Sequence, residues 1–157
     1  MRVARADADF DDWAGLLTLL HAAFAGMEGR INPPSSLHRL DAPSLASKAS
    51  EETLVLARDT DGRLVGCVFL KRETAALYVG KLAVAPEAQG RGIGRALMRA
   101  AEAEARNAGL RRLRLQTRVE LAENHETFAA LGFVETARTS HPGFDRPTTV
   151  EMMRLLD

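Results

Sequence analysis

The residues with the clearest chemical potential lie in one glycine-rich stretch near the middle of the chain. It runs from an apolar segment through a turn into the start of a helix: Leu82-Ala-Val-Ala-Pro-Glu-Ala-Gln-Gly-Arg-Gly-Ile-Gly-Arg95. Its three glycines let the backbone turn sharply and approach a ligand closely. The free N–H groups and the dipole of a helix's first turn favour an anion by about 0.3–1 kcal/mol. The stretch therefore predicts a phosphate-binding turn, to which three side chains add donors: Gln89, Arg91 and Arg95.

The glycine spacing excludes two familiar nucleotide-binding motifs. The dinucleotide fingerprint Gly-x-Gly-x-x-Gly fails because Arg95 stands where its last glycine belongs. The P-loop requires Lys and then Ser or Thr after its last glycine, and this chain has neither there. An ordinary glycine-rich turn between a strand and a helix remains the alternative to a phosphate site. Spacing alone does not separate these two interpretations.

At these residues the sequence resembles a known family. The run Leu82-Ala-Val-x-Pro86 followed by Gln89-x-x-Gly92-x-Gly94 is similar to the signature of the GNAT family of N-acetyltransferases, Gln/Arg-x-x-Gly-x-Gly/Ala. A second segment, Asn124-x-x-x-Phe128-x-x-Leu131-Gly132-Phe133, also resembles that family's pattern.

The resemblance implies that acetyl-coenzyme A is the acyl donor. In that family the turn's backbone amides hold the pyrophosphate, the strand before it offers its backbone to the pantetheine arm, and the asparagine contacts the cofactor. The implied cofactor-binding residues are Leu82, Ala83, Val84, Gln89, Gly90, Arg91, Gly92, Ile93, Gly94, Arg95, Asn124 and Phe128.

Charge and cysteine content exclude several kinds of partner. The 157 residues carry 21 Lys and Arg against 21 Asp and Glu, so bulk charge favours neither nucleic acid nor a membrane surface. Cys67 is the only cysteine, and His125 and Glu126 point apart on a helix, so we expect no metal. No signal peptide or membrane-length apolar run is visible. We expect a cytoplasmic protein with one domain, residues 1–157, and leave open whether it forms a homodimer.

Hydrophobic periodicity predicts an α/β fold in the order β-α-α-β-β-β-α-β-α-β-β. This order matches the GNAT fold, a mixed and mostly antiparallel seven-stranded sheet that splays between strands 4 and 5. The expected strands are Val3–Ala6, Thr53–Arg58, Leu64–Leu70, Ala75–Val84, Arg112–Arg118, Phe133–His141 and Thr148–Leu156. The expected helices begin near Asp9 (as N-cap), Asp41, Gly92 and Glu123, and end near Gly26, Ser50, Gly109 and Leu131.

A break in the alternation of the fourth strand predicts a β-bulge. The parity of the apolar residues changes at Gly80-Lys81, with Leu77 and Val79 before it and Leu82 and Val84 after it. An extra residue in a strand produces such a change, and bulges gather beside binding sites. The alternative is a fully buried strand without a bulge. In the GNAT fold a bulge here splays the strand from the next one, and the pantetheine arm pairs with the freed backbone.

Moving an acetyl group from a thioester to an amine requires two proton transfers. Presenting a lysine-like amine as the neutral base at pH 7 costs about 4–5 kcal/mol, and the departing thiolate needs a proton. Many GNAT relatives supply that proton from a tyrosine at the position of Phe128, which lacks a hydroxyl. Tyr78, the only tyrosine, is a candidate acid or relay, with a core aromatic as its alternative role. We identify no general base, and expect Cys67 to be a buried core residue rather than a nucleophile.

The acceptor site is expected in the two loops that the cofactor motif constrains least, Met27–Ser36 and Pro142–Pro147. The expected activity is transfer of an acetyl group from acetyl-CoA to a primary amine of a small-molecule or amino-acid-like acceptor. The alternatives are a non-catalytic protein that binds or senses acyl-CoA, and a protein N-terminal or lysine acetyltransferase. The candidate acceptor-binding residues, each with an ordinary exposed polar role as its alternative, are Glu28, Asn32, His38, His141 and Asp145.

Overall fold

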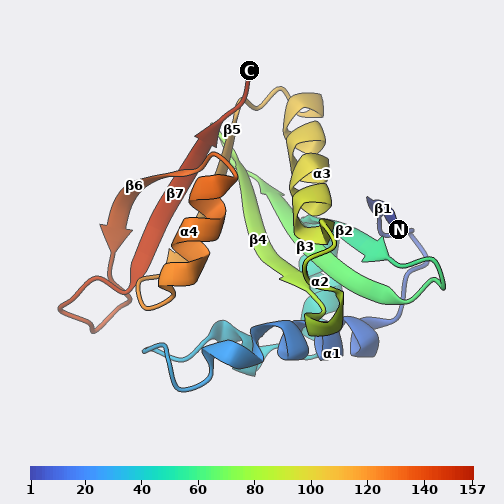
Figure 1. The fold of residues 1–157 in the computed structure, drawn as a ribbon, viewed down its shortest axis with the longest axis horizontal. Coiled ribbons are helices and arrows are strands. Elements are labelled where there is room, and N and C mark those ends of the chain that lie inside the picture. Colours follow the sequence, from blue (N-terminus) through green and yellow to red (C-terminus); the bar gives the residue numbers. More distant parts are fainter.

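The computed structural model describes residues 1–157 and contains seven strands and four α-helices in the expected order (Figure 1). Three short 3₁₀ helices lie in the connections: η1 (Ala25–Met27), η2 (Ser36–Arg39) and η3 (Pro86–Ala88). The α-helices are α1 (Trp13–Phe24), α2 (Ala42–Glu51), α3 (Ile93–Asn107) and α4 (Ala122–Ala130). The strands are β1 (Arg2–Arg5), β2 (Thr53–Arg58), β3 (Leu64–Arg72), β4 (Leu77–Val84), β5 (Arg112–Arg118), β6 (Val134–Thr139) and β7 (Thr149–Leu155).

All seven strands join one sheet in the order β1-β2-β3-β4-β5-β7-β6. Neighbouring strands run antiparallel, except that β4 and β5 run parallel. The α/β fold class and the mixed, mostly antiparallel sheet predicted from the sequence are therefore confirmed. None of the helices combines the length and apolar composition that crossing a bilayer requires.

Helices cover both faces of the sheet. α1 and α2 pack against one face of β2–β4, and α3 packs against the other. The alternation of β3 separates the two faces, because Phe69 contacts Lys48 of α2 whereas Gly66 lies against α3. Any residue of β3 or β4 can therefore be assigned to the α3 face or to the opposite face, the α1–α2 face.

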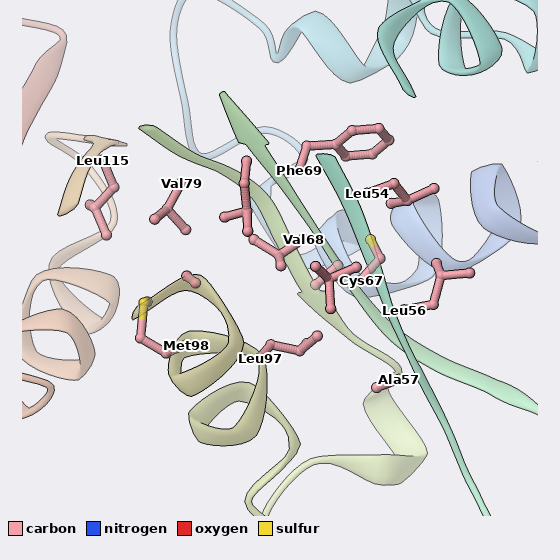
Figure 2. Close-up of a cluster of buried hydrophobic side chains, with 14 of the residues drawn as sticks. Leu54, Leu56, Ala57, Cys67, Val68, Phe69, Val79, Leu97, Met98 and Leu115 are labelled. Carbon is pink, nitrogen blue, oxygen red and sulfur yellow. The ribbon is translucent and has the colours of Figure 1, made fainter. Parts of the chain in front are cut away.

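Buried apolar side chains form one continuous core across these layers. In Figure 2, Leu97 and Met98 of α3 face Val68 and Val79 of the sheet, and Leu115 of β5 lies beside them. The same core thus holds β4 and β5, the two strands that flank the candidate site.

The first helix begins later than the sequence predicted, and its N-cap is Asp12 rather than Asp9. A carboxylate oxygen of Asp12 accepts a hydrogen bond from the backbone N–H of Gly15 at 3.0 Å. Asp9 instead lies within a turn that is closed by a hydrogen bond from the N–H of Phe10 to the carbonyl of Asp7. The ring of Phe10 packs edge-on against Trp13, with 4.9 Å between centroids. Both aspartates suit an N-cap, but Asp9 belongs to the preceding turn, so Asp12 caps the helix.

The bulge predicted in β4 is present. Cys67 pairs with Ala83 and Phe69 pairs with Gly80, so Val68 lies opposite two residues of β4, at positions 81 and 82. The first of these, Lys81, has a positive φ of 52°, which is uncommon for a residue with a side chain. Its carbonyl, displaced from the regular ladder, accepts a hydrogen bond from the Cys67 thiol at 3.5 Å. The bulge is therefore built into the core.

β4 and β5 pair with each other over only a short length. Their parallel ladder has only two pairs, Leu77 with Leu113 and Tyr78 with Arg114. Beyond these pairs β4 and β5 diverge, and Figure 1 shows the two halves of the sheet opening away from each other. We call the region between Val79–Val84 and Leu115–Arg118 the fork. The splay predicted between strands 4 and 5 is confirmed.

Gly66 allows α3 to lie close to the sheet. A Cβ at this position would sit 3.0 Å from Ile93 and 3.1 Å from Leu97, both on α3, and 3.1 Å from the carbonyl oxygen of Ala83. These neighbours include the first residue of α3, so the glycine helps to set where the N-terminus of α3 lies relative to β4.

We predict that Gly66→Ala destabilises the protein by about 1–3 kcal/mol, because the added methyl group overpacks a core with a rigid carbonyl on one side. Gly26→Ala is the matched control, since a Cβ there would meet nothing within 4 Å. Its free energy of unfolding is expected to stay within about 0.5 kcal/mol of wild type. Urea denaturation followed by circular dichroism measures both, and equal midpoints for the two variants would contradict the packing argument.

Candidate active site

The glycine turn presents a row of free backbone donors. Gly90 and Gly92 have φ angles of 79° and 80°, the left-handed region that favours glycine, and Gly92 is the N-cap of α3. Within the protein, no acceptor pairs with the backbone N–H groups of residues 90–95. Six consecutive amides therefore surround one helix N-terminus, where the dipole adds partial positive charge.

The side chains around this turn leave it positive. Arg91 and Arg95 are exposed and have no acidic partner. The neighbouring carboxylate, Glu87, is paired with Arg63, with 2.7 Å between Arg63 Nη2 and Glu87 Oε1. Gln89 is exposed at the end of η3. This donor set fits an anion with several oxygens, such as a diphosphate.

The turn adjoins the unpaired edge of β4. From Val79 to Val84 this strand has a ladder partner only in β3, so alternate backbone groups on its β5 side remain free. Val84 lies on the α3 face, 3.8 Å from the position that a Cβ on Gly94 would take. The first turn of α3 and the free edge of β4 are thus directly continuous on that face.

The loop between α1 and α2 reaches across to the far side of the fork. Arg118, at the end of β5, donates to the carbonyls of Pro33 and Pro34 at 2.6 and 3.2 Å. Arg30 pairs with Glu123 of α4 at 2.5 Å. We call residues 29–36 the strap, since they connect the β4 side of the fork to the β5 side.

The strap also meets the turn between β6 and β7. The guanidinium of Arg146 donates to the carbonyl of Asn32 at 3.0 Å, and Glu120 accepts from the Asn32 backbone N–H at 3.1 Å. The structure therefore brings together the two loops that the sequence analysis named for the acceptor. One carboxylate oxygen of Glu120 is buried there and has no hydrogen-bond partner.

The individual candidate residues for acceptor binding differ in their contacts and exposure. Glu28 and His38 are both exposed, and His38 Nε2 lies 3.0 Å from a carboxylate oxygen of Glu28. His141 contacts the Thr148 hydroxyl at 2.5 Å, and burial lowers the pKa of His141, so its imidazole is neutral at pH 7. Asp145 is exposed at the tip of the β6–β7 turn. Of these four residues, only Glu28 and His38 contact each other, whereas Asn32 lies in the strap itself.

Tyr78 lies where the fork begins, on the α1–α2 face. Its ring lies 4.6 Å from the guanidinium carbon of Arg114, and its hydroxyl donates to the side-chain oxygen of Gln116 at 3.4 Å. Gln116 and Arg114 both bond to Glu151, the latter at 2.5 Å. Burial raises the pKa of Tyr78, so the hydroxyl keeps its proton at neutral pH and has a proton to donate.

The second motif segment occupies α4. Phe128 packs edge-on against the buried Phe133, with 6.1 Å between ring centroids. Asn124 is in the first turn of α4 and partly exposed. Phe128 has no hydroxyl, so Tyr78 is the only side chain of the protein with a phenolic proton.

Lys81 is a functional candidate that sequence reasoning left unassigned. It occupies the bulge, is partly buried on the α1–α2 face, and donates from Nζ to the Ser36 hydroxyl of η2 at 3.0 Å. The sequence did contain a signal for it, because Lys81 follows a glycine inside an otherwise apolar strand, where the alternation of apolar residues changes parity.

Two surface pockets lie away from the fork, around β1 and the segment that leads from it into α1. Their shared lining includes Phe10, Ala6 and Arg5, and it brings no nucleophile together with a base. We assign no chemistry to them. No group of three or more His, Cys, Asp and Glu side chains with the spacing of metal ligands occurs in the protein.

Comparison with family models matches residues 13–133 to the acetyltransferase (GNAT) family. The matched segment contains the bulged strand, the glycine turn and α4. The chain belongs to the GNAT family.

Two curated relatives of this GNAT protein are similar in sequence. Aminoglycoside N(6')-acetyltransferase type 1 of Stenotrophomonas maltophilia is 40% identical over 98 residues, which are 57% of this chain and 64% of that protein. IAA acetyltransferase of Azospirillum brasilense is 38% identical over 109 residues, which are 68% of this chain and 69% of that protein. The chain thus spans about two thirds of the length of each relative.

Solved structures share the whole fold. The PaiA N-acetyltransferase of Thermoplasma acidophilum, in complex with coenzyme A, has a TM-score of 0.79 at 17% identity, with 99% of each chain covered. A GNAT family acetyltransferase of Elizabethkingia anophelis with acetyl-CoA bound has a TM-score of 0.70 at 17% identity, covering 99% of this chain and 97% of that one. At these identities the likeness concerns the fold.

The environment of Cys67 predicts that its thiol is inert. Burial raises the pKa of Cys67 to about 12, so the thiol is protonated at pH 8, and no solvent reaches it. We expect dithionitrobenzoate at pH 8 to label less than about 5% of the native protein in an hour and to label one thiol per chain at once in 8 M urea. Rapid stoichiometric labelling of the native protein would show that the core around the bulge is open.

Proposed function

We propose that this protein is an acetyl-CoA-dependent N-acetyltransferase that acts on a primary amine of a small-molecule or amino-acid-like acceptor. The observation that carries the proposal is the row of six unpaired amides at residues 90–95, continuous with the free edge of β4 at the fork. Membership of the GNAT family supports the acetyltransferase activity. Acetyl-CoA and coenzyme A bound to proteins of the same fold support the donor.

The residues of the α3 face suit the two polar parts of the donor. The amides of Gly90–Arg95, with the guanidiniums of Arg91 and Arg95, would hold the pyrophosphate. The free backbone groups of Leu82–Val84 would pair with the amides of the pantetheine arm, in the manner of an added strand. Asn124 and Phe128, on α4 across the fork, would line the arm from the other side.

Acetyl-CoA supplies the acetyl group as an activated thioester. The protein must then orient a neutral amine toward that carbon and provide a proton to the sulfur. Tyr78 would serve the second task, and its position at the start of the fork and its retained proton at neutral pH support this role. Donor and acceptor approach from opposite faces of the sheet, which suits direct transfer without an acyl-enzyme.

The first experiment is a thiol-release assay with acetyl-CoA and a panel of amines. The panel contains amino acids, aliphatic and aromatic amines, an aminoglycoside (in view of one relative's name) and short peptides with free N-termini or lysines. Turnover of a small amine supports the proposal. Turnover confined to peptides would point to a protein acetyltransferase, and acetyl-CoA binding without any turnover would point to a binding or sensing protein.

We predict that Gly92→Asp lowers the affinity for acetyl-CoA about 100-fold or more, since it places a carboxylate among the amides that meet the pyrophosphate. Gly62→Asp is the matched control. Gly62 has the same φ, 81° against 80°, and likewise has open space around it, but it lies in the β2–β3 turn. Calorimetry on both folded variants gives the answer, and unchanged affinity in Gly92→Asp would remove the phosphate assignment.

We predict that Tyr78→Phe lowers kcat about 100-fold while leaving the KM for acetyl-CoA unchanged, because only the proton for the thiolate is lost. Wild-type kcat is expected to fall at alkaline pH as Tyr78 ionises above its usual range, and the variant should lack that limb. Phe128→Tyr is the companion variant, and it should raise turnover at high pH only if proton supply limits the reaction. A wild-type rate in Tyr78→Phe would indicate protonation by solvent.

A further inference from the structure

Lys81 presents its charge to the α1–α2 side of the fork without an acidic partner. The bulge places it there, with φ of 52°, and its side chain is partly buried. The ammonium has one hydrogen-bond partner, the hydroxyl of Ser36 at 3.0 Å. No carboxylate lies within salt-bridge distance of it. Two of its three N–H donors are therefore left without a partner in the protein.

The surroundings of Lys81 are cationic. Burial is the main cause of its lowered pKa, and the charges of Lys48, Arg39 and Arg118 lower that pKa further. Glu52 is the acid that acts in the other direction, and it is bound to Lys48 at 2.8 Å. Arg39 has no acidic partner, and Arg118 uses its donors on backbone carbonyls of the strap.

The donor does not account for this cluster. The glycine turn and Val84 lie on the α3 face, whereas Lys81 reaches Ser36 on the opposite face. The phosphates of a bound donor at Gly90–Arg95 are thus separated from Lys81 by the sheet. The fold does not require the charge either, because an unpaired, partly buried ammonium among like charges costs folding free energy.

We propose that Lys81, assisted by Ser36 and Arg39, is an anion-binding subsite for the acceptor, which is therefore an amine that also carries a carboxylate or phosphate group. The inference rests on the N-acetyltransferase proposed above and names its substrate class. An acceptor anion would take up the free Lys81 donors in charge-assisted hydrogen bonds and neutralise the local excess of positive charge. A purely cationic polyamine would meet repulsion at the same place.

The test compares matched acceptors that differ only in the anion. Amino acids with small, aliphatic and aromatic side chains are each paired with their carboxamides, and O-phosphoethanolamine is paired with ethanolamine. In at least one of these pairs, the wild-type protein is expected to have a kcat/KM at least tenfold higher for the anionic acceptor than for its neutral counterpart. Whether the amino acid or the phosphate pair shows the larger ratio identifies the anion. Lys81→Met should reduce that ratio to about one, and Lys81→Arg should retain part of it.

Two controls separate charge recognition from damage. Lys71→Met removes a lysine from an exposed position of β3 that has no part in the cluster, and its ratio should stay at the wild-type value. The affinity of Lys81→Met for acetyl-CoA should also be unchanged, since the donor binds on the other face. Loss of acetyl-CoA binding in Lys81→Met would overturn the inference, because the lysine would then belong to the donor site.

Calorimetry keeps the two proposals distinguishable. N-acetylated amino acids and their amides are titrated into the protein saturated with coenzyme A, which reports the subsite without turnover. Tighter binding of the anionic product, lost in Lys81→Met, supports the subsite even if no amine in the panel is acetylated. The subsite is overturned if the N-acetylated amino acid and its amide bind equally or not at all, or if anionic and neutral acceptors are turned over equally. Turnover of neutral amines would still support the proposed N-acetyltransferase function.

Discussion

The extra residue in β4 is the constraint on which the rest of the site depends. Two residues of β4 lie opposite Val68 alone, and this turns the strand away from β5 just beyond Tyr78. The displaced carbonyl of Lys81 accepts a hydrogen bond from the Cys67 thiol, so the bulge does not leave this carbonyl unpaired. A free strand edge, a fork and a lysine directed to one face all follow from this single insertion, which the surrounding core holds in place.

In the proposed reaction, the donor and the acceptor bind on opposite faces of the sheet. On the α3 face, close packing over Gly66 helps to set the helix N-terminus beside the end of β4, and the unpaired amides of residues 90–95 offer donors that suit an anion. On the α1–α2 face, the polar network around Tyr78 and the cationic surroundings of Lys81 line the fork, and the strap is tied across it by Arg118. Opposed approach routes of this kind suit a direct transfer between two bound molecules.

Local pattern predicted most of the fold because the decisive signals were local. Strand bounds such as Thr53–Arg58, the Asp41 cap of α2 and the parity change at Gly80-Lys81 all depend on neighbouring residues. The helix start at Asp12 rather than Asp9 did not follow from pattern, since both aspartates suit an N-cap and in the folded chain Asp9 belongs to the Asp7–Phe10 turn. The ties from the strap to β5, α4 and the β6–β7 turn join residues more than 80 positions apart, which no local pattern reports.

By itself, the sequence determined the family, the glycine turn that suits a coenzyme A pyrophosphate, and the strand whose parity breaks beside it. These features depend on residue type and short spacing, and backbone groups carry their chemistry. Only the tertiary structure decided which side chains line the fork and are therefore candidates for the acceptor site. It turned Lys81 toward Ser36 and away from the donor face, and it joined Tyr78 to Gln116 and Arg114. Side-chain direction at a bulge and contacts between distant strands depend on the packing of the whole core, so they become visible only once the chain is folded.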